Sequence, residues 1–391
     1  MKSRWEVIVI GAGPAGAMTA FRLARSGVRV LLVDKAAFPR VKVCGSCLNA
    51  RALRELKNAG LGHLTVIEKA LRLETFTWMR GGRRLRIPLS AEVGLSRERL
   101  DQRLVLEACS AGAEFWDNAS ATVETAEAGA IFPRKSSSTD GCIRVHVQTP
   151  QKNFVLETEM AVIAGGLQGG ILKNVPENIR VEKNSYLGAG TLLHNGTAAY
   201  PAGTLFMATA SQGYCGLVRL EDGRLNMAAA FSAQALSHEK RIPAVIAGIL
   251  REAGADIPEG LEHAAWKGTP KLSRYCRNPA GRRYFALGDA AGYIEPFTGE
   301  GIYWALAQAR LLTDLMKPHA FRWHESLADE WKKIHSAFLC QETRTCRAVT
   351  PLLRSSFWSA QTFALFERFP RLAAWTARRL NGAVRFIDGS A

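Results

Sequence analysis

Three glycines and one carboxylate near the N-terminus have the spacing of a nucleotide-binding turn. Gly11, Gly13 and Gly16 form the pattern G-x-G-x-x-G, and Asp34 follows roughly 20 residues later. In this pattern the first glycine permits a tight turn, the second lets a pyrophosphate approach the backbone, and the third lets a helix close on a strand. The carboxylate can accept hydrogen bonds from ribose hydroxyls. These residues predict the binding of a dinucleotide.

The hydrophobic pattern places these residues on a strand–turn–helix–strand unit. Val7–Ile10 predict a buried strand, a helix follows the turn to about Ser26, and Val28–Val33 predict a second strand. The helix N-terminus then presents free N–H groups and the positive end of its dipole to the phosphates. The alternative is a glycine-rich turn in an α/β core that binds no ligand.

The composition limits the class of partner. With 391 residues, 47% of them hydrophobic, the chain can form two or more domains around a sizeable core. A net charge of +16 suits cofactor phosphates, an acidic carrier or an anionic membrane surface. Lys and Arg are scattered and no nucleic-acid motif accompanies them, so we expect no nucleic acid. Sparse cysteines and the lack of a long apolar run indicate a cytoplasmic protein, with a peripheral position at the inner membrane face as the alternative.

Two cysteines could do redox chemistry. Cys44 and Cys47 have the C-x-x-C spacing of a redox dithiol or half a zinc site, but no further ligands match, so no metal is expected. With the glycine-rich turn, the stretch of Pro39, Lys42, Cys44 and Gly45 resembles the FAD-dependent geranylgeranyl-reductase group. That group is related to flavin-dependent halogenases and to aromatic monooxygenases of the para-hydroxybenzoate-hydroxylase type. The resemblance implies that Cys44 and Gly45 lie beside a flavin ring, whereas Cys47 is at least as suited to packing.

A second stretch, residues 284–306, is similar to the second FAD motif of the same superfamily. A strand leads into Gly288 and Asp289, and a glycine-containing loop opens an amphipathic helix. The resemblance implies that Asp289 binds the ribityl and ribose side of FAD and that the loop lies beneath the flavin pyrimidine. Backbone N–H groups there would stabilise negative charge on the reduced flavin. Two motifs in the correct order predict tightly bound FAD, with NAD(P)H as a transient electron donor.

A further helix, capped by Ser96, begins at Arg97, and the resemblance implies that this arginine lies close to FAD. A solvated helix start is the alternative for Arg97. The residues expected to bind the cofactor are Gly11, Gly13, Pro14, Ala15, Gly16, Asp34, Lys35, Cys44, Gly45, Arg97, Gly288, Asp289, Pro296, Gly299, Gly301 and Ile302.

Strand patterns dominate the middle of the chain. Residues 71–90 alternate around Gly81-Gly82 and predict a hairpin. Residues 185–231 predict strand after strand, with hairpin turns at Asn195-Gly196 and Asp222-Gly223. We interpret these segments as an antiparallel substrate-binding sheet.

Four residues of this sheet are candidates for contact with substrate. Where the reductase group and the tryptophan halogenases have tryptophan-containing motifs, this chain keeps only Tyr214, and Gly216 opens room over the flavin. Tyr214 and Cys44 are therefore the candidate catalytic residues. Arg219 could bind an anionic substrate group, although a surface strand arginine is the simpler interpretation. His194 is the best single candidate for a general base, although most lone histidines pack or face solvent.

These elements predict an α/β (α+β) fold. It consists of a Rossmann-like FAD-binding domain of the glutathione-reductase type, an inserted antiparallel β-sheet substrate domain and a C-terminal helical region. The expected boundaries are 1–70, 96–180 and 280–320 for the FAD-binding domain, 71–95 and 181–279 for the substrate domain, and 321–391 for the helical region. The last region is aromatic and basic, and it could be a helical cap or lie against a lipid or carrier surface.

The expected function is that of an FAD-dependent oxidoreductase acting on a hydrophobic substrate that is aromatic, polyketide-like or isoprenoid-like and possibly carrier-linked. Gly165-Gly166 replace the Asp-Gly pair of related hydroxylases, which argues against the simplest of them. The loss of the tryptophan motif argues against a reductase that saturates C=C bonds. We expect a monooxygenase, with that reductase, a halogenase or a flavin-containing binding protein as alternatives. A separate flavin reductase is a possible partner.

Overall fold

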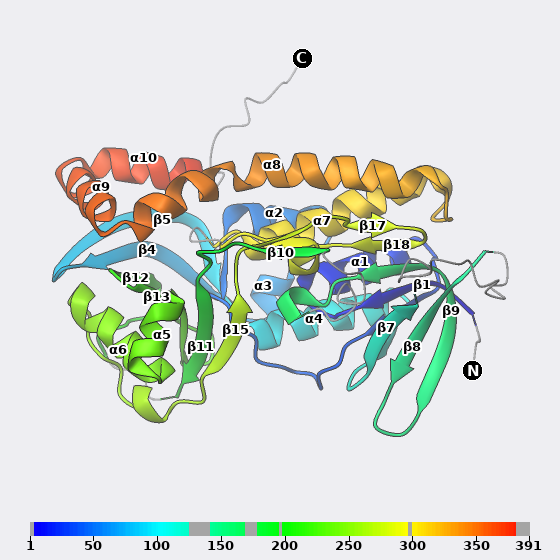
Figure 1. The fold of residues 1–391 in the computed structure, drawn as a ribbon, viewed down its shortest axis with the longest axis horizontal. Coiled ribbons are helices and arrows are strands. Elements are labelled where there is room, and N and C mark those ends of the chain that lie inside the picture. Colours follow the sequence, from blue (N-terminus) through cyan, green and yellow to red (C-terminus); the bar gives the residue numbers. More distant parts are fainter. Residues whose placement is uncertain (1–3, 125–140, 169–177, 195–197, 296–298, 381–391) are drawn as a thin grey trace, which may run out of the picture.

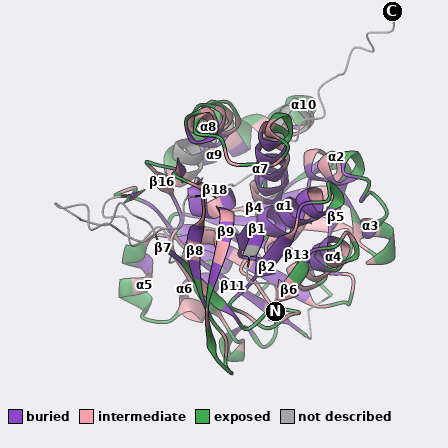
Figure 2. Cartoon of the chain, turned by 90° about the vertical axis from the view of Figure 1, so that its right-hand side faces the viewer, coloured by how far each residue is buried: buried purple, intermediate pink, exposed green. Residues whose placement is uncertain are grey.

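The computed structural model describes residues 4–124, 141–168, 178–194, 198–295 and 299–380. Two large β-sheets lie next to each other, and the C-terminal helices form a layer across both (Figure 1). Buried residues fill the strands and the inner faces of the helices, while exposed residues lie on the outer helices and loops (Figure 2).

The first sheet is built on the predicted strand–turn–helix–strand unit. Its central strand β1 (Arg4–Ile10) pairs in parallel with β2 (Val30–Val33) and with β9 (Asn153–Ile163). The strand order is β17-β18-β9-β1-β2-β6, with β8 attached to β9 and β7 to β8. The other strands are β6 (Glu114–Trp116), β7 (Ser120–Glu124), β8 (Ile143–Gln148), β17 (Ala280–Gly281) and β18 (Tyr284–Ala286). The carboxyl ends of the parallel strands meet at one edge, where ligands bind in such folds.

Helices cover this sheet. The structure confirms the helix after the glycine turn, the helix capped by Ser96, and the helix after Asp289. Val28 N–H donates to the Leu23 carbonyl (3.1 Å), so β2 begins two residues later than predicted. The helices are α1 (Pro14–Arg25), α2 (Ala50–Asn58), α3 (Leu64–Ile67), α4 (Arg97–Ser110) and α7 (Gly301–Met316).

The second sheet has the order β15-β11-β14-β13-β12-β4-β5-β3. The hairpin around Gly81-Gly82 is confirmed as β4 and β5, and the Asp222-Gly223 turn joins the antiparallel β13 and β14. Helices α5 (Ala233–Glu239) and α6 (Ile242–Ala253) pack against the sheet. The strands are β3 (Cys47–Leu48), β4 (Leu71–Arg80), β5 (Arg83–Gly94), β11 (Leu187–Leu193), β12 (Thr204–Ala210), β13 (Gly213–Arg219), β14 (Leu225–Phe231) and β15 (Lys267–Lys271).

Two expectations for this sheet are wrong. The sheet is mixed rather than antiparallel, because β12 pairs in parallel with β4, Thr204 opposite Thr75. In addition, β11 pairs with β14 and β15 instead of β12, so the strands on either side of Asn195-Gly196 do not form a hairpin. The turn residues themselves lie outside the described residues. Local turn signals could not show that a hairpin from residues 71–94 joins the edge of strands that come much later in the chain.

The C-terminal helices pack on both sheets. They are α8 (Ser326–Arg354), α9 (Ser356–Arg368) and α10 (Pro370–Leu380). Trp78 of β4 packs edge-on against Phe363 of α9 with ring centroids 5.2 Å apart, and Ala373 of α10 completes this cluster with Leu85 and Ile87. Burial of aromatic side chains of this size stabilises the contact by several kcal/mol in total, on the order of 2 kcal/mol for each ring. A small third sheet contains β10 (Ile179–Val181), β16 (Arg274–Cys276) and β19 (Gly292–Tyr293).

Candidate functional site

The glycine-rich turn is held tightly against the ends of β1 and β9. A Cβ on Gly11 would overlap with the carbonyl of Ala164, and one on Gly16 would overlap with the carbonyl of Gly11. A Cβ on Gly13 would instead meet only the guanidinium groups of Arg40 and Arg97, each at 3.8 Å. The N-terminus of α1 and two cations therefore converge on one open position. This is the arrangement that binds a pyrophosphate.

A buried carboxylate that the sequence analysis missed positions the two arginines. Asp101 on α4 accepts hydrogen bonds from Arg97 Nε (2.8 Å) and from Arg40 Nη1 (2.9 Å). Arg40 also lies 3.4 Å from Asp34, whose Oδ2 accepts from the Ala12 N–H at 2.7 Å. Asp34 thus fixes the backbone of the turn as well as lying at the predicted ribose position. The four-residue spacing of Arg97 and Asp101 on one helix was the available signal.

The charged side chains around the glycine-rich turn suit an anionic ligand. Burial raises the pKa of Asp289, although Arg97 and Lys42 oppose this effect. Burial, followed by repulsion from Arg40 and Arg97, lowers the pKa of Lys42. Burial also lowers the pKa of Arg97, but attraction by Asp101 outweighs it, so the net pKa of Arg97 is raised. Arg97 is therefore always a cation.

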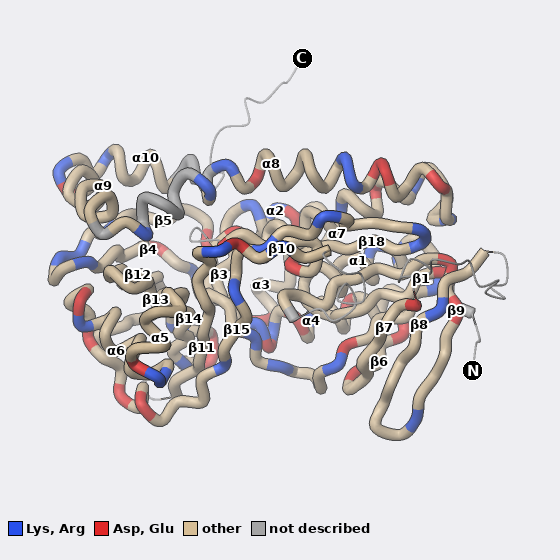
Figure 3. Tube along the Cα trace, viewed as in Figure 1, with Lys and Arg blue, Asp and Glu red and all other residues tan. Residues whose placement is uncertain are grey.

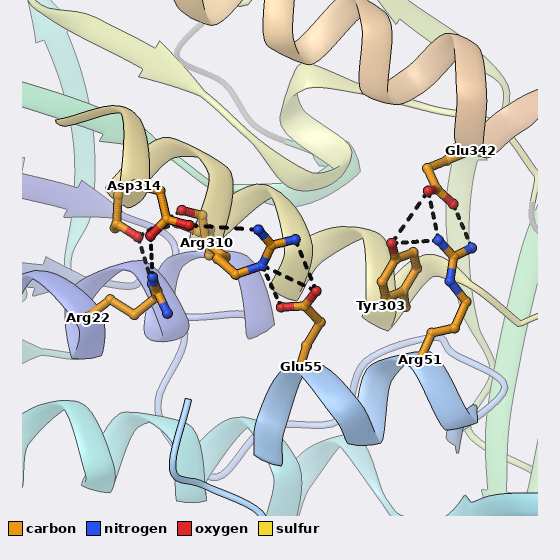
Figure 4. A network of polar contacts seen from close by, with 9 residues as sticks. Arg22, Arg51, Glu55, Tyr303, Arg310, Asp314 and Glu342 are labelled. Carbon is orange, nitrogen blue, oxygen red and sulfur yellow. Dashed lines mark hydrogen bonds and ion pairs between the residues drawn. The ribbon is translucent and has the colours of Figure 1, made fainter. Parts of the chain in front are cut away.

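The helix that follows the second motif is fixed from three sides (Figure 4). Arg51 of α2 binds Glu342 of α8 at 2.6 Å and donates to the Tyr303 hydroxyl of α7 at 2.6 Å. Further along α7, Arg310 pairs with Glu55 (3.0 Å), and Asp314 pairs with Arg22 of α1 (2.6 Å). These contacts hold the N-terminus of α7 against the predicted flavin site.

Glu300 immediately precedes α7 and lies 3.6 Å from Arg51. Burial raises its pKa from 4.5 to about 7, although Arg51 opposes the shift. The carboxyl group therefore titrates near neutral pH at the point where the resemblance places the flavin pyrimidine. Nothing in the sequence predicted a raised pKa for Glu300.

A single cavity of about 1140 Å³ joins the glycine turn, the start of α7 and the second sheet. Of the predicted cofactor residues, those that line it are Gly11, Gly13, Pro14, Ala15, Asp34, Lys35, Cys44, Gly45, Arg97, Gly288, Asp289, Gly299, Gly301 and Ile302. Gly16 packs behind Gly11 instead, and Pro296 lies outside the described residues. Two motifs far apart in the sequence thus meet around one cavity.

The residues that the sequence suggested for redox chemistry or substrate contact divide into two groups. Cys44, Cys47 and Tyr214 line the cavity. Arg219 does not, since its guanidinium donates to the carbonyls of Tyr200 (3.0 Å) and Gly223 (2.8 Å). His194 is exposed and is not among the lining residues. These positions agree with the simpler interpretations, which were a strand arginine for Arg219 and a surface histidine for His194. The sequence pattern of each strand could not show whether these side chains point toward the cavity or away from it.

Tyr214 belongs to a polar array in the cavity wall. Its hydroxyl is hydrogen-bonded to Glu295, and burial followed by the Glu295 charge raises its pKa well above 10. Glu295 is in turn 2.6 Å from Arg354, whose guanidinium lies 4.3 Å from the centre of the Tyr186 ring. Arg354 is the last residue of α8. The C-terminal region thus supplies a side chain that contacts the cavity wall through Glu295, which sequence reasoning missed.

The comparisons with known proteins agree with this geometry. A family model described as an FAD binding domain matches residues 4–318. The chain belongs to this FAD-binding family. It is accordingly an FAD-binding protein of the hydroxylase, halogenase and reductase group of oxidoreductases, with the fold that the sequence predicted.

Individual relatives are distant. Conditioned medium factor receptor 1 of Dictyostelium discoideum is 25% identical over 79% of this chain, which spans 62% of that protein. Menaquinone reductase of Mycobacterium tuberculosis (strain H37Rv) is 27% identical, covering 83% of this chain and 80% of the reductase. The structure of the flavin-dependent brominase Bmp2 triple mutant has a TM-score of 0.73 at 16% identity, covering 97% of this chain and 94% of Bmp2. At that identity the structural likeness shows the fold alone.

The residues present fit FAD. The turn has no space for a Cβ on Gly11 or Gly16, while the space beside Gly13 is open and lies next to two guanidinium groups. The start of α7 lines the same cavity. When bound, FAD supplies the redox chemistry, and the protein supplies binding, orientation and exclusion of water.

Proposed function

We propose that this chain is an FAD-dependent monooxygenase that hydroxylates an aromatic ring carried on an apolar substrate. The supporting observation is that one cavity is lined both by Tyr214 and Glu295 of the Tyr214–Glu295–Arg354 array and by a largely apolar part. The apolar lining residues of this part include Phe76, Trp78, Ile87, Leu89, Leu205 and Met207. Such a lining binds an aromatic ring or an apolar chain better than water. The array adds one polar group that can recognise a hydroxyl on the substrate.

The direction of the hydrogen bond determines what Tyr214 can offer. The Glu295 carboxylate accepts from Arg354, and because carboxylates only accept, the Tyr214 hydroxyl donates to Glu295. This leaves the Tyr214 oxygen as an acceptor for a substrate hydroxyl. A phenol bound there donates a hydrogen bond to the Tyr214 oxygen, which the hydrogen bond from Tyr214 to Glu295 makes a better acceptor. The negative charge that this bond builds up on the phenol oxygen makes the ring electron-rich. An electron-rich ring is the form that reacts with an electrophilic oxygen atom.

The proposed reaction consumes one O₂ and one NAD(P)H for each substrate. One oxygen atom enters the C–H bond that becomes C–OH, and the other leaves as water. NAD(P)H binds transiently or a partner flavin reductase supplies the electrons, since the sequence contains no second G-x-G-x-x-G turn for a resident nicotinamide nucleotide.

The test follows oxygen uptake and product with NADH or NADPH and a panel of phenols that carry alkyl or isoprenoid chains. We expect substrate-dependent oxygen uptake equimolar with product, and no product under strict anaerobiosis. Product formation without oxygen would exclude a monooxygenase. A flavin that remains oxidised with every donor and substrate would favour a binding protein.

A second candidate is a reductase of C=C bonds. It is favoured by the menaquinone reductases, which are 25–27% identical and match 77–80% of their own length. This reaction requires a proton donor to carbon, whereas the hydrogen of Tyr214 already points to Glu295. Anaerobic saturation of an isoprenoid double bond by the reduced enzyme would establish this candidate. A halogenase, the third alternative, would require halide for turnover.

A further inference from the structure

The outer face of the last two helices is apolar and exposed. Among the described residues, six of the twelve exposed large apolar side chains lie on α9, on α10 or at their junction, including all four aromatic ones. They are Phe357, Trp358, Leu365, Phe369, Leu372 and Trp375, and we call them the α9–α10 face. Their exposed fractions run from 39% to 63%. Exposed apolar side chains gathered on two helices that contact each other indicate a contact surface.

The opposite face of the same helices lines the cavity. The lining residues there are Thr362, Phe366, Ala373, Thr376 and Ala377. A single layer of helix therefore separates the apolar part of the cavity from the exposed α9–α10 face. In Figure 1 these two helices form the outermost layer over β4 and β5.

Basic residues accompany the apolar ones. From Ser355 to Leu380 the sequence has four arginines and one acidic residue, Glu367. Glu367 is paired with Arg83 at 2.8 Å, while Arg368 and Arg371 are exposed at the junction of the two helices. Figure 3 shows charge at this junction and mainly uncharged residues along α10. Aromatic and aliphatic side chains with arginines at their edge are typical of helices that lie in the surface of an anionic bilayer.

We propose that the α9–α10 face docks on an anionic lipid bilayer and that the cavity beneath it takes its apolar substrate from that bilayer. Docking stands on the patch itself, and the source of the substrate rests on the proposed function. Within the described ranges, no helix combines the length and low charge needed to cross a bilayer. A second copy of the chain suits this face less well, since a two-fold axis through the junction would bring Arg368 and Arg371 close to their own counterparts.

The experiment measures co-sedimentation of the FAD-loaded protein with phosphatidylcholine vesicles, with and without phosphatidylglycerol. We expect binding to the anionic vesicles at low salt, weakened by added salt. The variant W358S/F369S/W375S should bind at least about tenfold more weakly. The matched control V66S/I67S removes two exposed apolar side chains of α3 and should bind like the wild type. R368Q/R371Q should lose the preference for phosphatidylglycerol. The flavin spectrum and melting temperature confirm that each variant is folded.

Three results would overturn the proposal. The first is wild-type protein that stays in the supernatant with anionic vesicles at low salt. The second is equal binding by the triple serine variant and the wild type. The third is a wild-type dimer in light scattering that the triple variant abolishes, which would make the face a self-interface. Hydroxylation of a short, water-soluble phenol is independent of all three, so failure of docking and failure of the proposed function are distinguishable.

Discussion

At the scale of single residues, the hydroxyl of Tyr214 carries the proposed chemistry. Y214F keeps the ring and removes the acceptor, so we expect kcat to fall by a factor of about 10²–10⁴ while FAD stays bound. Stopped-flow measurement of flavin reduction and product formation checks this. Y200F is the matched control, because the Tyr200 hydroxyl binds the backbone of Asp256 and does not line the cavity. An unchanged kcat in Y214F would remove Tyr214 from the mechanism.

Glu300 gives a prediction about pH. Its pKa is about 7 in the folded protein and 4.5 ordinarily, so the folded state binds more protons between these values and stability falls as pH rises through them. The loss of folding stability caused by ionising the buried Glu300 is absent below pH 4.5 and reaches about 3 kcal/mol above pH 7. E300Q should therefore be stabilised relative to wild type at pH 8 and not at pH 4. Urea unfolding at both pH values measures this, with the exposed E259Q as control. Equal effects at both pH values would contradict the assignment.

Gly16 gives a prediction about backbone space. A Cβ at this position would overlap with the Gly11 carbonyl, so G16A should displace the turn and abolish FAD retention on purification. G248A is the matched control, since it also adds a methyl group to a helix but meets no atom within 4 Å. That variant should gain about 1 kcal/mol of stability, measured by urea unfolding. A yellow G16A protein would contradict the close fit.

At the scale of elements, Asp101 joins α4 to the segment after β2. D101N leaves two buried guanidinium groups without their shared carboxylate, so we expect a loss of about 3 kcal/mol in the free energy of unfolding and weaker FAD binding. Calorimetry and flavin fluorescence titration measure the two effects. E98Q removes a carboxylate from the same helix outside this cluster, where Arg224 keeps Asp222 as a partner, and should leave FAD binding unchanged. An unchanged FAD affinity in D101N would show that Arg40 and Arg97 keep their positions without the Asp101 carboxylate.

The elements show where sequence reasoning succeeded and where it could not. Gly11 and Asp34 were predicted because their spacing around a strand and a helix is a local pattern. Arg97 and Asp289 were predicted because the segments that contain them resemble those of the FAD-dependent group. The parallel pairing of β4 and β12 has no local signal, since it depends on how distant segments dock. The same holds for Arg354, which meets Glu295 across 59 residues of sequence. The direction of a strand side chain such as Arg219 also depends on a partner sheet that no single segment reveals.

At the scale of the whole molecule, the cofactor site draws on residues from Gly11 to Ile302 and joins both large sheets. FAD that binds only the folded protein should raise its apparent stability by about 2.7 kcal/mol at a free concentration of 100 times Kd. Scanning calorimetry of apoprotein and FAD-loaded protein measures this as a rise in Tm that continues with added FAD. A Tm independent of FAD would mean that the two motifs do not converge on one ligand.

The cavity is continuous from the glycine turn to the inner faces of α9 and α10. In the proposed function FAD occupies the end at the glycine turn, so the substrate would have its reacting ring at the flavin and its apolar tail toward α9 and α10. The preferred length of the tail would then be set at α9 and α10, where Phe366 and Ala373 line the cavity, rather than by residues near the chemistry. Enlarging Ala373 would shorten the preferred tail without changing the atom that reacts.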